Sequence, residues 1–96
     1  MKLLIFSDIH GSLPVAKRIL ALVETHDPVA VLILGDVLYH GPRNPQPSGY
    51  APKAVAEALS PLASRIIAIR GNCDSEVDAM VLPFPLAAPF SWLLHE

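Results

Sequence analysis

Three short apolar runs in this 96-residue chain each stop abruptly at polar residues, and this pattern restricts the fold more than any other feature. The first run, residues 2–7, leads into Asp8, and the later two lead into Gly35-Asp36 and Gly71-Asn72. Continuous apolar runs of this length are typical of parallel strands buried on both faces. Because parallel strands need long crossovers, usually helical, the sequence predicts an α/β fold with a parallel β-α-β-α-β core.

Two segments between the runs have helical features. Pro14 is favourable in the first turn of a helix, which then presents an apolar stripe of Val15, Ile19, Leu22 and Val23. The stretch 26–28 ends this helix, because a residue before proline avoids the helical region. Pro52 opens a second helix, and Pro61 ends or kinks it.

The remaining segments are less regular. Residues 39–52 are rich in proline and glycine and are expected to form a long surface loop. Residues 75–80 favour a short helical turn, and three prolines predict irregular structure over 81–89. Residues 91–95 resemble the start of a further strand, an exposed edge at which the chain would pair with a second copy.

Composition limits the class of protein. A length of 96 residues allows one domain, here 1–96, and an apolar fraction of 52% is enough for a core. The net charge of −2 gives no electrostatic footprint for nucleic acid or an anionic membrane. The single cysteine, Cys73, fits a reducing compartment, and the N-terminal apolar run is too short for a signal peptide. A soluble cytoplasmic protein without membrane contact is therefore expected.

Four candidate metal ligands lie where the predicted strands end. Asp8 and His10 are two residues apart, and an extended backbone would point both to the same side. Alone, they also fit a capping aspartate and a surface histidine. Asp36 and Asn72 follow the other two strands, and the carboxyl ends of parallel strands share one edge. Such a set suits two divalent cations, with Asp36 as a bridging carboxylate.

In their order and spacing, residues 7–11, Gly35-Asp36 and residues 71–74 resemble the D-x-H, G-D and G-N-[HC]-D motifs of the calcineurin-like metallophosphoesterases. Residues 38–44 and 71–76 resemble most closely the small bacterial phosphodiesterases of that family. The resemblance implies the N-terminal half of an αββα sandwich and hydrolysis of a phosphodiester.

The same resemblance implies two divalent metal ions, with manganese a common choice. Asp8 and His10 would hold the first ion, Asp36 would bridge both, and Asn72 would hold the second.

Three further residues have two interpretations each. His40 could contact the phosphate or the leaving group, or lie exposed on its loop. Cys73 stands where many members of the family carry a histidine, so it is either a catalytic contact or a small buried side chain. Arg43 could clamp a phosphate oxygen or remain a solvated surface charge.

The family also has G-H and G-H-x-H motifs in a C-terminal half, and these are absent from the printed sequence. We therefore expect a metal-dependent phosphodiesterase with a dinuclear centre, present as an incomplete chain that acts on a phosphodiester slowly. The alternative is a catalytically silent half-domain that self-associates or needs a partner chain. A metal-independent nucleotide-binding module is a third possibility, but no glycine-rich fingerprint supports it.

Overall fold

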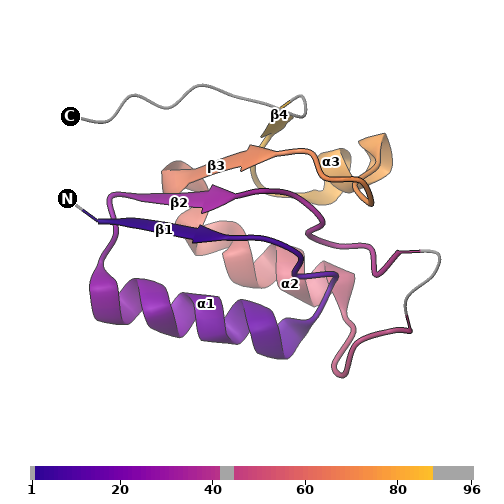
Figure 1. Ribbon diagram of the computed structural model, residues 1–96, viewed down its shortest axis with the longest axis horizontal. Coiled ribbons are helices and arrows are strands. Elements are labelled where there is room, and N and C mark those ends of the chain that lie inside the picture. Colours follow the sequence, from indigo (N-terminus) through magenta and orange to yellow (C-terminus); the bar gives the residue numbers. More distant parts are fainter. Residues whose placement is uncertain (1, 42–44, 88–96) are drawn as a thin grey trace.

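The computed structural model describes residues 2–41 and 45–87 and shows a four-stranded sheet with helices between the strands (Figure 1). In chain order the elements are β1 (Leu3–Phe6), α1 (Leu13–His26), β2 (Ala30–Ile33), α2 (Pro52–Leu59), a 3-10 helix η1 (Ser60–Arg65), β3 (Ile66–Ile69), α3 (Glu76–Val81) and β4 (Leu86–Ala87). The strands lie in the order β1-β2-β3-β4, and every neighbouring pair is parallel. The predicted α/β class and its β-α-β-α-β order are confirmed.

Helix α1 begins at the Ser12 cap and ends at Asp27, which adopts a left-handed conformation. Two members of its predicted apolar stripe, Ile19 and Val23, are buried as predicted, but Val15 and Leu22 are 39% and 43% exposed. The side chains that α1 buries are Ala16, Ile19 and Val23. Among the described residues, no helix has the length and apolar character needed to cross a membrane.

The core lies on one side of the sheet, where α1 and α2 pack against it and against each other (Figure 1). The strand side chains that point to this side include Val31, Ile33 and Ala68, all of which are buried. Helix α2 begins at Pro52, and the chain passes into η1 at Ser60, immediately before Pro61. The predicted effect of Pro61 is therefore confirmed.

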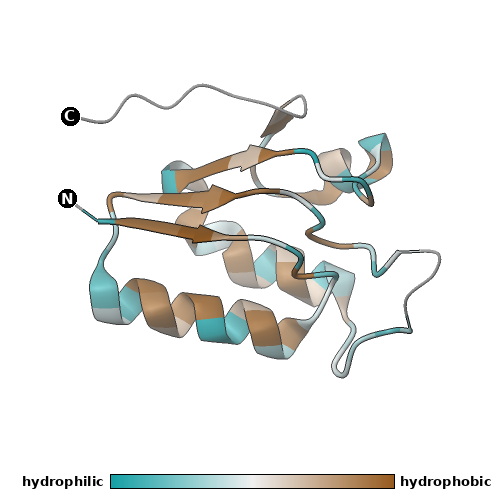
Figure 2. Ribbon diagram, in the orientation of Figure 1, coloured by the Kyte–Doolittle hydropathy of each residue, from teal (hydrophilic) through white to brown (hydrophobic). Residues whose placement is uncertain are grey.

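The opposite face of the sheet is also apolar, because nearly all strand residues, brown in Figure 2, are hydrophobic and successive side chains alternate between the faces. Strand register places on this face Leu3, Ile5, Ala30, Leu32, Ile67, Ile69 and Ala87. Ile5 is 56% exposed and Ile67 is 38% exposed. The prediction that the first strand is buried on both faces is wrong for the described residues, because α1 and α2 share one side (Figure 1).

Strand β4 corrects the prediction that residues 81–89 are irregular. Leu86 and Ala87 pair with β3, and the N–H of Arg70 donates to the Ala87 carbonyl at 3.2 Å. The strand begins directly after Pro85, a position where the missing N–H of proline is tolerated. The further strand predicted over 91–95 lies outside the described residues.

Candidate metal centre

The loops that follow β1 and β2 run side by side beyond the sheet. The N–H of Asp8 donates to the Gly35 carbonyl at 3.1 Å, and the N–H of His10 donates to the Asp36 carbonyl at 2.9 Å. Both hydrogen bonds are donated by the loop after β1 to the loop after β2. They bring the polar residues after β1 against those after β2.

Asp8, His10 and Asp36 share an unusual backbone conformation, with φ values of 60°, 50° and 56°. The assumption that Asp8 and His10 lie on extended backbone is therefore wrong, because β1 ends at Phe6 and the chain turns. A left-handed conformation costs about 1–2 kcal/mol for a residue other than glycine. Such residues cluster at sites where the surrounding structure holds them for a function.

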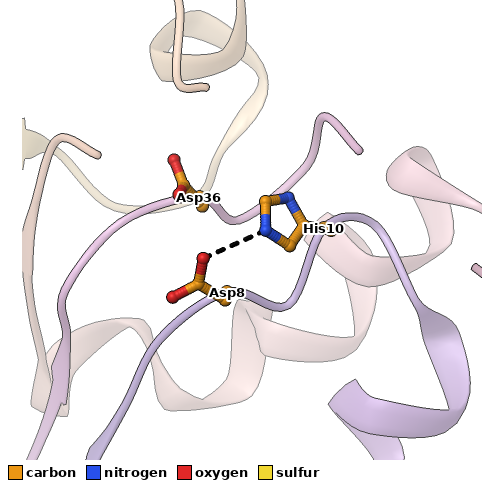
Figure 3. A group of neighbouring side chains, drawn as sticks. All are labelled: Asp8, His10 and Asp36. Atoms are coloured by element: carbon orange, nitrogen blue, oxygen red, sulfur yellow. Dashed lines mark hydrogen bonds and ion pairs between the residues drawn. The ribbon is translucent and has the colours of Figure 1, made fainter. Parts of the chain in front are cut away.

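The three side chains converge, as Figure 3 shows. One possible ligand atom from each of Asp8, His10 and Asp36 lies within 4.8 Å of the other two. His10 Nε2 lies 3.0 Å from Asp8 Oδ1, the contact dashed in Figure 3. Two carboxylates and one imidazole are a donor set that suits a divalent cation.

His10 is also held from its other side. Its Nδ1 lies 2.8 Å from the Tyr39 carbonyl oxygen. Because a carbonyl can only accept, Nδ1 must carry the proton, and in the neutral ring Nε2 keeps its lone pair. That lone pair faces the two carboxylates. Metal-binding histidines usually have their second nitrogen fixed in this way, so the residues present fit a metal ion.

The ionisation of the triad reflects its crowded negative charge. The Ser7 hydroxyl, 2.6 Å from Asp8 Oδ2, is the main cause of the lowered pKa of Asp8. Burial, and then the neighbouring Asp8 carboxylate, raise the pKa of Asp36. Burial opposes protonation of His10, yet the Tyr39 carbonyl and Asp8 raise its pKa overall. A cation at this point would replace the proton as the balancing charge.

The loop after β3 brings two predicted residues to Asp36. The Asn72 amide faces the Asp36 carboxylate and, oriented with its nitrogen as donor, lies 2.7 Å from Oδ2. The backbone N–H of Cys73 donates to Asp36 Oδ1 at 2.7 Å. Burial, followed by Asp36 and Asp74, raises the pKa of the Cys73 thiol, so this group stays protonated at neutral pH.

His40 lies beside the triad but not in it. Its ring contacts the rings of Tyr39 and Tyr50, with centroid distances of 4.9 Å and 5.1 Å. Arg43 lies outside the described residues.

A cavity of about 350 Å³ opens next to this site. Its walls come from the loop after β2, the start of α2 and the segment around α3, namely Leu38, Tyr39, Tyr50, Pro52, Cys73, Ser75, Val77 and Asp78. Two of these residues also contact the triad, Tyr39 through its carbonyl and Cys73 through its N–H. The cavity therefore adjoins the candidate metal centre.

Asp74 is a component of the site that the residue-by-residue prediction missed. It is buried, and its carboxylate accepts hydrogen bonds from the N–H groups of Asp36, Val37 and Gly71. Its place in the G-N-C-D stretch was visible in the sequence. However, an aspartate immediately before Ser75 and a short helix is equally typical of a helix cap, so its position alone did not indicate a role in the site.

Comparison with known proteins gives one consistent result. A family model for calcineurin-like phosphoesterases matches residues 1–94. Phosphodiesterase YfcE of Escherichia coli strain K12 is 56% identical over 96 residues, which are all of this chain and 52% of that protein. The YfcE proteins of E. coli O6:H1 and O157:H7 match to the same extent.

Among solved structures, Yfce, a phosphoesterase from E. coli, aligns with a TM-score of 0.96 and 55% identity. The alignment covers 100% of this chain and 53% of the Yfce chain. The chain thus spans about half the length of the relatives that it matches.

Proposed function

Because the chain belongs to the calcineurin-like phosphoesterase family, we propose that it acts in the metal-dependent hydrolysis of a phosphodiester. The observation that carries this proposal is the convergence of Asp8, His10 and Asp36 at one edge of a parallel sheet. Ligands of such sheets bind outside the carboxyl ends of the strands, which is where these residues lie. The names of the similar YfcE phosphodiesterases support the same reaction.

The proposed centre holds two divalent ions. Asp8 and His10 would hold the first, Asp36 would be shared by both, and the Asn72 amide would hold the second. When bound, such ions neutralise phosphoryl oxygens and make water a stronger nucleophile. Manganese is the proposed metal, because carboxylate and amide oxygens with one imidazole suit it.

The residues of the chain have distinct proposed roles in this reaction. The Tyr39 carbonyl holds His10 with Nε2 toward the carboxylates, so the ligand needs no reorientation when an ion arrives. His40, packed against two tyrosine rings, contacts the leaving group. Cys73 lines the cavity and is proposed to contact the substrate there. Arg43 is proposed to clamp a phosphate oxygen.

The cavity beside the centre is proposed to take an organic group of the phosphodiester. Its lining is mostly apolar, and Ser75 and Asp78 already use their polar atoms in a capping box at the start of α3. Two tyrosine side chains in the lining suit a planar aromatic group. The phosphate would then lie at the triad, and Tyr39 and Cys73 would stand between the phosphate and the organic group.

The test is hydrolysis of bis(4-nitrophenyl) phosphate by the purified chain. We expect slow release of nitrophenolate that depends on added manganese and is abolished by Asp36→Asn, because that substitution removes the bridging charge. Calorimetry with manganese should show one weak binding event, since among residues 2–41 and 45–87 the proposed ligands of the second ion are Asp36 and Asn72 alone. Absence of any manganese binding would overturn the proposed function.

A second candidate follows from the uncovered apolar face of the sheet. Ile5 and Ile67 on that face are 56% and 38% exposed. Apolar patches of this kind usually mark an interaction surface. The chain would then be a catalytically silent half-domain that pairs with a second copy or another chain. In either case the single cysteine fits a reducing, cytoplasmic setting.

A further inference from the structure

The carboxylate of Asp74 joins two loops that follow different strands. Asp74 Oδ2 accepts from the N–H of Asp36 at 2.6 Å and from the N–H of Gly71 at 2.7 Å. Asp74 Oδ1 accepts from the N–H of Val37 at 3.1 Å. Three charge-assisted hydrogen bonds thus connect the loop after β2 to the loop after β3.

The hydrogen bonding is reciprocal. While Asp74 accepts from the backbone of Asp36, the side chain of Asp36 accepts from the N–H of Cys73 at 2.7 Å. The Asp36 carboxylate is therefore oriented by the residue that precedes Asp74. Because Asp36 also has a left-handed backbone, its conformation depends on such external contacts.

Two glycines allow this close approach. A Cβ atom added at Gly35 would collide with the backbone of Gly71, and one added at Gly71 would collide with the Asp36 carboxylate. Gly35 also has a φ of 104°, which side chains rarely permit. The loops can therefore touch backbone to backbone, and Asp74 spans the contact.

Two simpler roles for Asp74 do not fit. Helix α3 is capped by Ser75 and Asp78, whose side chains satisfy each other's backbone N–H groups, so α3 does not need the Asp74 carboxylate. Both carboxylate oxygens of Asp74 already accept backbone hydrogen bonds in a buried position, so they are not presented as metal ligands.

We propose that Asp74 is a positioning residue for the metal centre, which fixes Asp36 as a preformed ligand by tying the loop after β2 to the loop after β3. This inference rests on the proposed function, because it concerns the metal site of that function. If it is correct, a substitution of Asp74 lowers the affinity for metal by more than its effect on the stability of the fold can explain.

The test compares Asp74→Asn with the matched control Asp27→Asn in the full chain. In Asp74→Asn one acceptor oxygen becomes an N–H donor that faces a backbone N–H, so Asp36 loses part of its support. We expect manganese affinity by calorimetry to fall about tenfold to 100-fold, the range typical of residues that support metal ligands. Asp27→Asn, which weakens only an exposed ion pair with Arg65, should leave manganese affinity unchanged.

Thermal unfolding without metal measures how far each substitution lowers the stability of the fold. Comparing this loss with the change in manganese affinity separates a positioning role from a merely structural one. Equal affinity of Asp74→Asn and the unaltered chain for manganese would overturn the inference, even if both substitutions lower the melting temperature. If the unaltered chain binds no manganese, the proposed function fails and the inference fails with it.

If Asp74→Asn does not fold by circular dichroism, Asp74→Glu provides the same comparison. It keeps the carboxylate and displaces it by one methylene, so affinity should fall while the far-ultraviolet spectrum is retained. Unchanged affinity in a folded Asp74→Glu would overturn the inference.

Discussion

His10 illustrates how one backbone carbonyl can prepare a side chain for chemistry. The Tyr39 carbonyl requires a proton on Nδ1, which leaves Nε2 to the two carboxylates. When Nε2 carries a proton, the ring forms an ion pair with Asp8. When a cation replaces that proton, Nε2 becomes a ligand of the cation. The residue-scale chemistry of the site is therefore a competition between a proton and a metal ion.

The first prediction concerns pH. Because the pKa of His10 is raised, the folded chain holds the competing proton up to a higher pH than a free histidine would. Manganese affinity should rise about tenfold per pH unit below that pKa and level off above it, across roughly pH 5 to 8. Calorimetry at several pH values measures this slope, and an affinity independent of pH would contradict it.

The second prediction compares two imidazoles. His10→Ala removes one of the three converging ligands, so manganese affinity should fall by more than about tenfold. His40→Ala is the control, because His40 packs against tyrosine rings outside the triad. It should keep manganese affinity but slow hydrolysis of the aryl phosphodiester. A loss of affinity in His40→Ala equal to that in His10→Ala would contradict these roles.

At the scale of the elements, the grouping of the site could be predicted but its local geometry could not. Asp8, Asp36 and Asn72 follow consecutive strands, and parallel strand ends share an edge. The left-handed backbone at Asp8 depends on its hydrogen bond to Gly35, a residue far along the chain. No local pattern carries that information.

Two other elements show the same dependence on tertiary context. Strand β4 exists because β3 offers an edge beside Leu86, and the prolines around it conceal this in the sequence. The buried stripe of α1 contains Ala16, which a search for large apolar residues overlooks. Ala16 is buried because its small side chain permits close packing under the sheet.

The third prediction concerns the cavity beside α3. Val77 lines the cavity, whereas Met80 lies on the same helix outside its lining, and both are largely exposed. Val77→Asp should weaken binding of 4-nitrophenyl phosphate in the presence of manganese by roughly tenfold, or ~1.4 kcal/mol, because it adds a second carboxylate beside Asp78 and removes an apolar contact. Inorganic phosphate should bind as before.

Met80→Asp is the control, and it should change the affinity for neither ligand. Titration of all three proteins with both ligands gives the comparison. If Val77→Asp weakens both ligands equally, the cavity does not select the organic group, and the effect belongs to the phosphate site.

For the whole molecule, the decisive feature is the asymmetry of the sheet. One face is covered by α1 and α2, while no helix of residues 2–41 and 45–87 covers the other (Figure 1), on which Ile5 and Ile67 are exposed. Burying apolar area contributes about 25 cal/mol per Å². The total stability of a small domain is only ~5–15 kcal/mol, so the free energy gained by covering this face would be a large addition to it.

The last prediction is that a chain limited to the printed sequence self-associates through this face. Ile67→Lys places a charge at the centre of the face and should shift the chain toward monomer, because a buried, unpaired ammonium is costly. Leu22→Lys makes the same change on the outer side of α1, where 43% exposure tolerates it, and should leave association unaltered. Light scattering after size exclusion at micromolar concentration measures the mass of each protein. A monomeric unaltered chain, or an equal shift in both variants, would show that this face is not the surface through which copies meet.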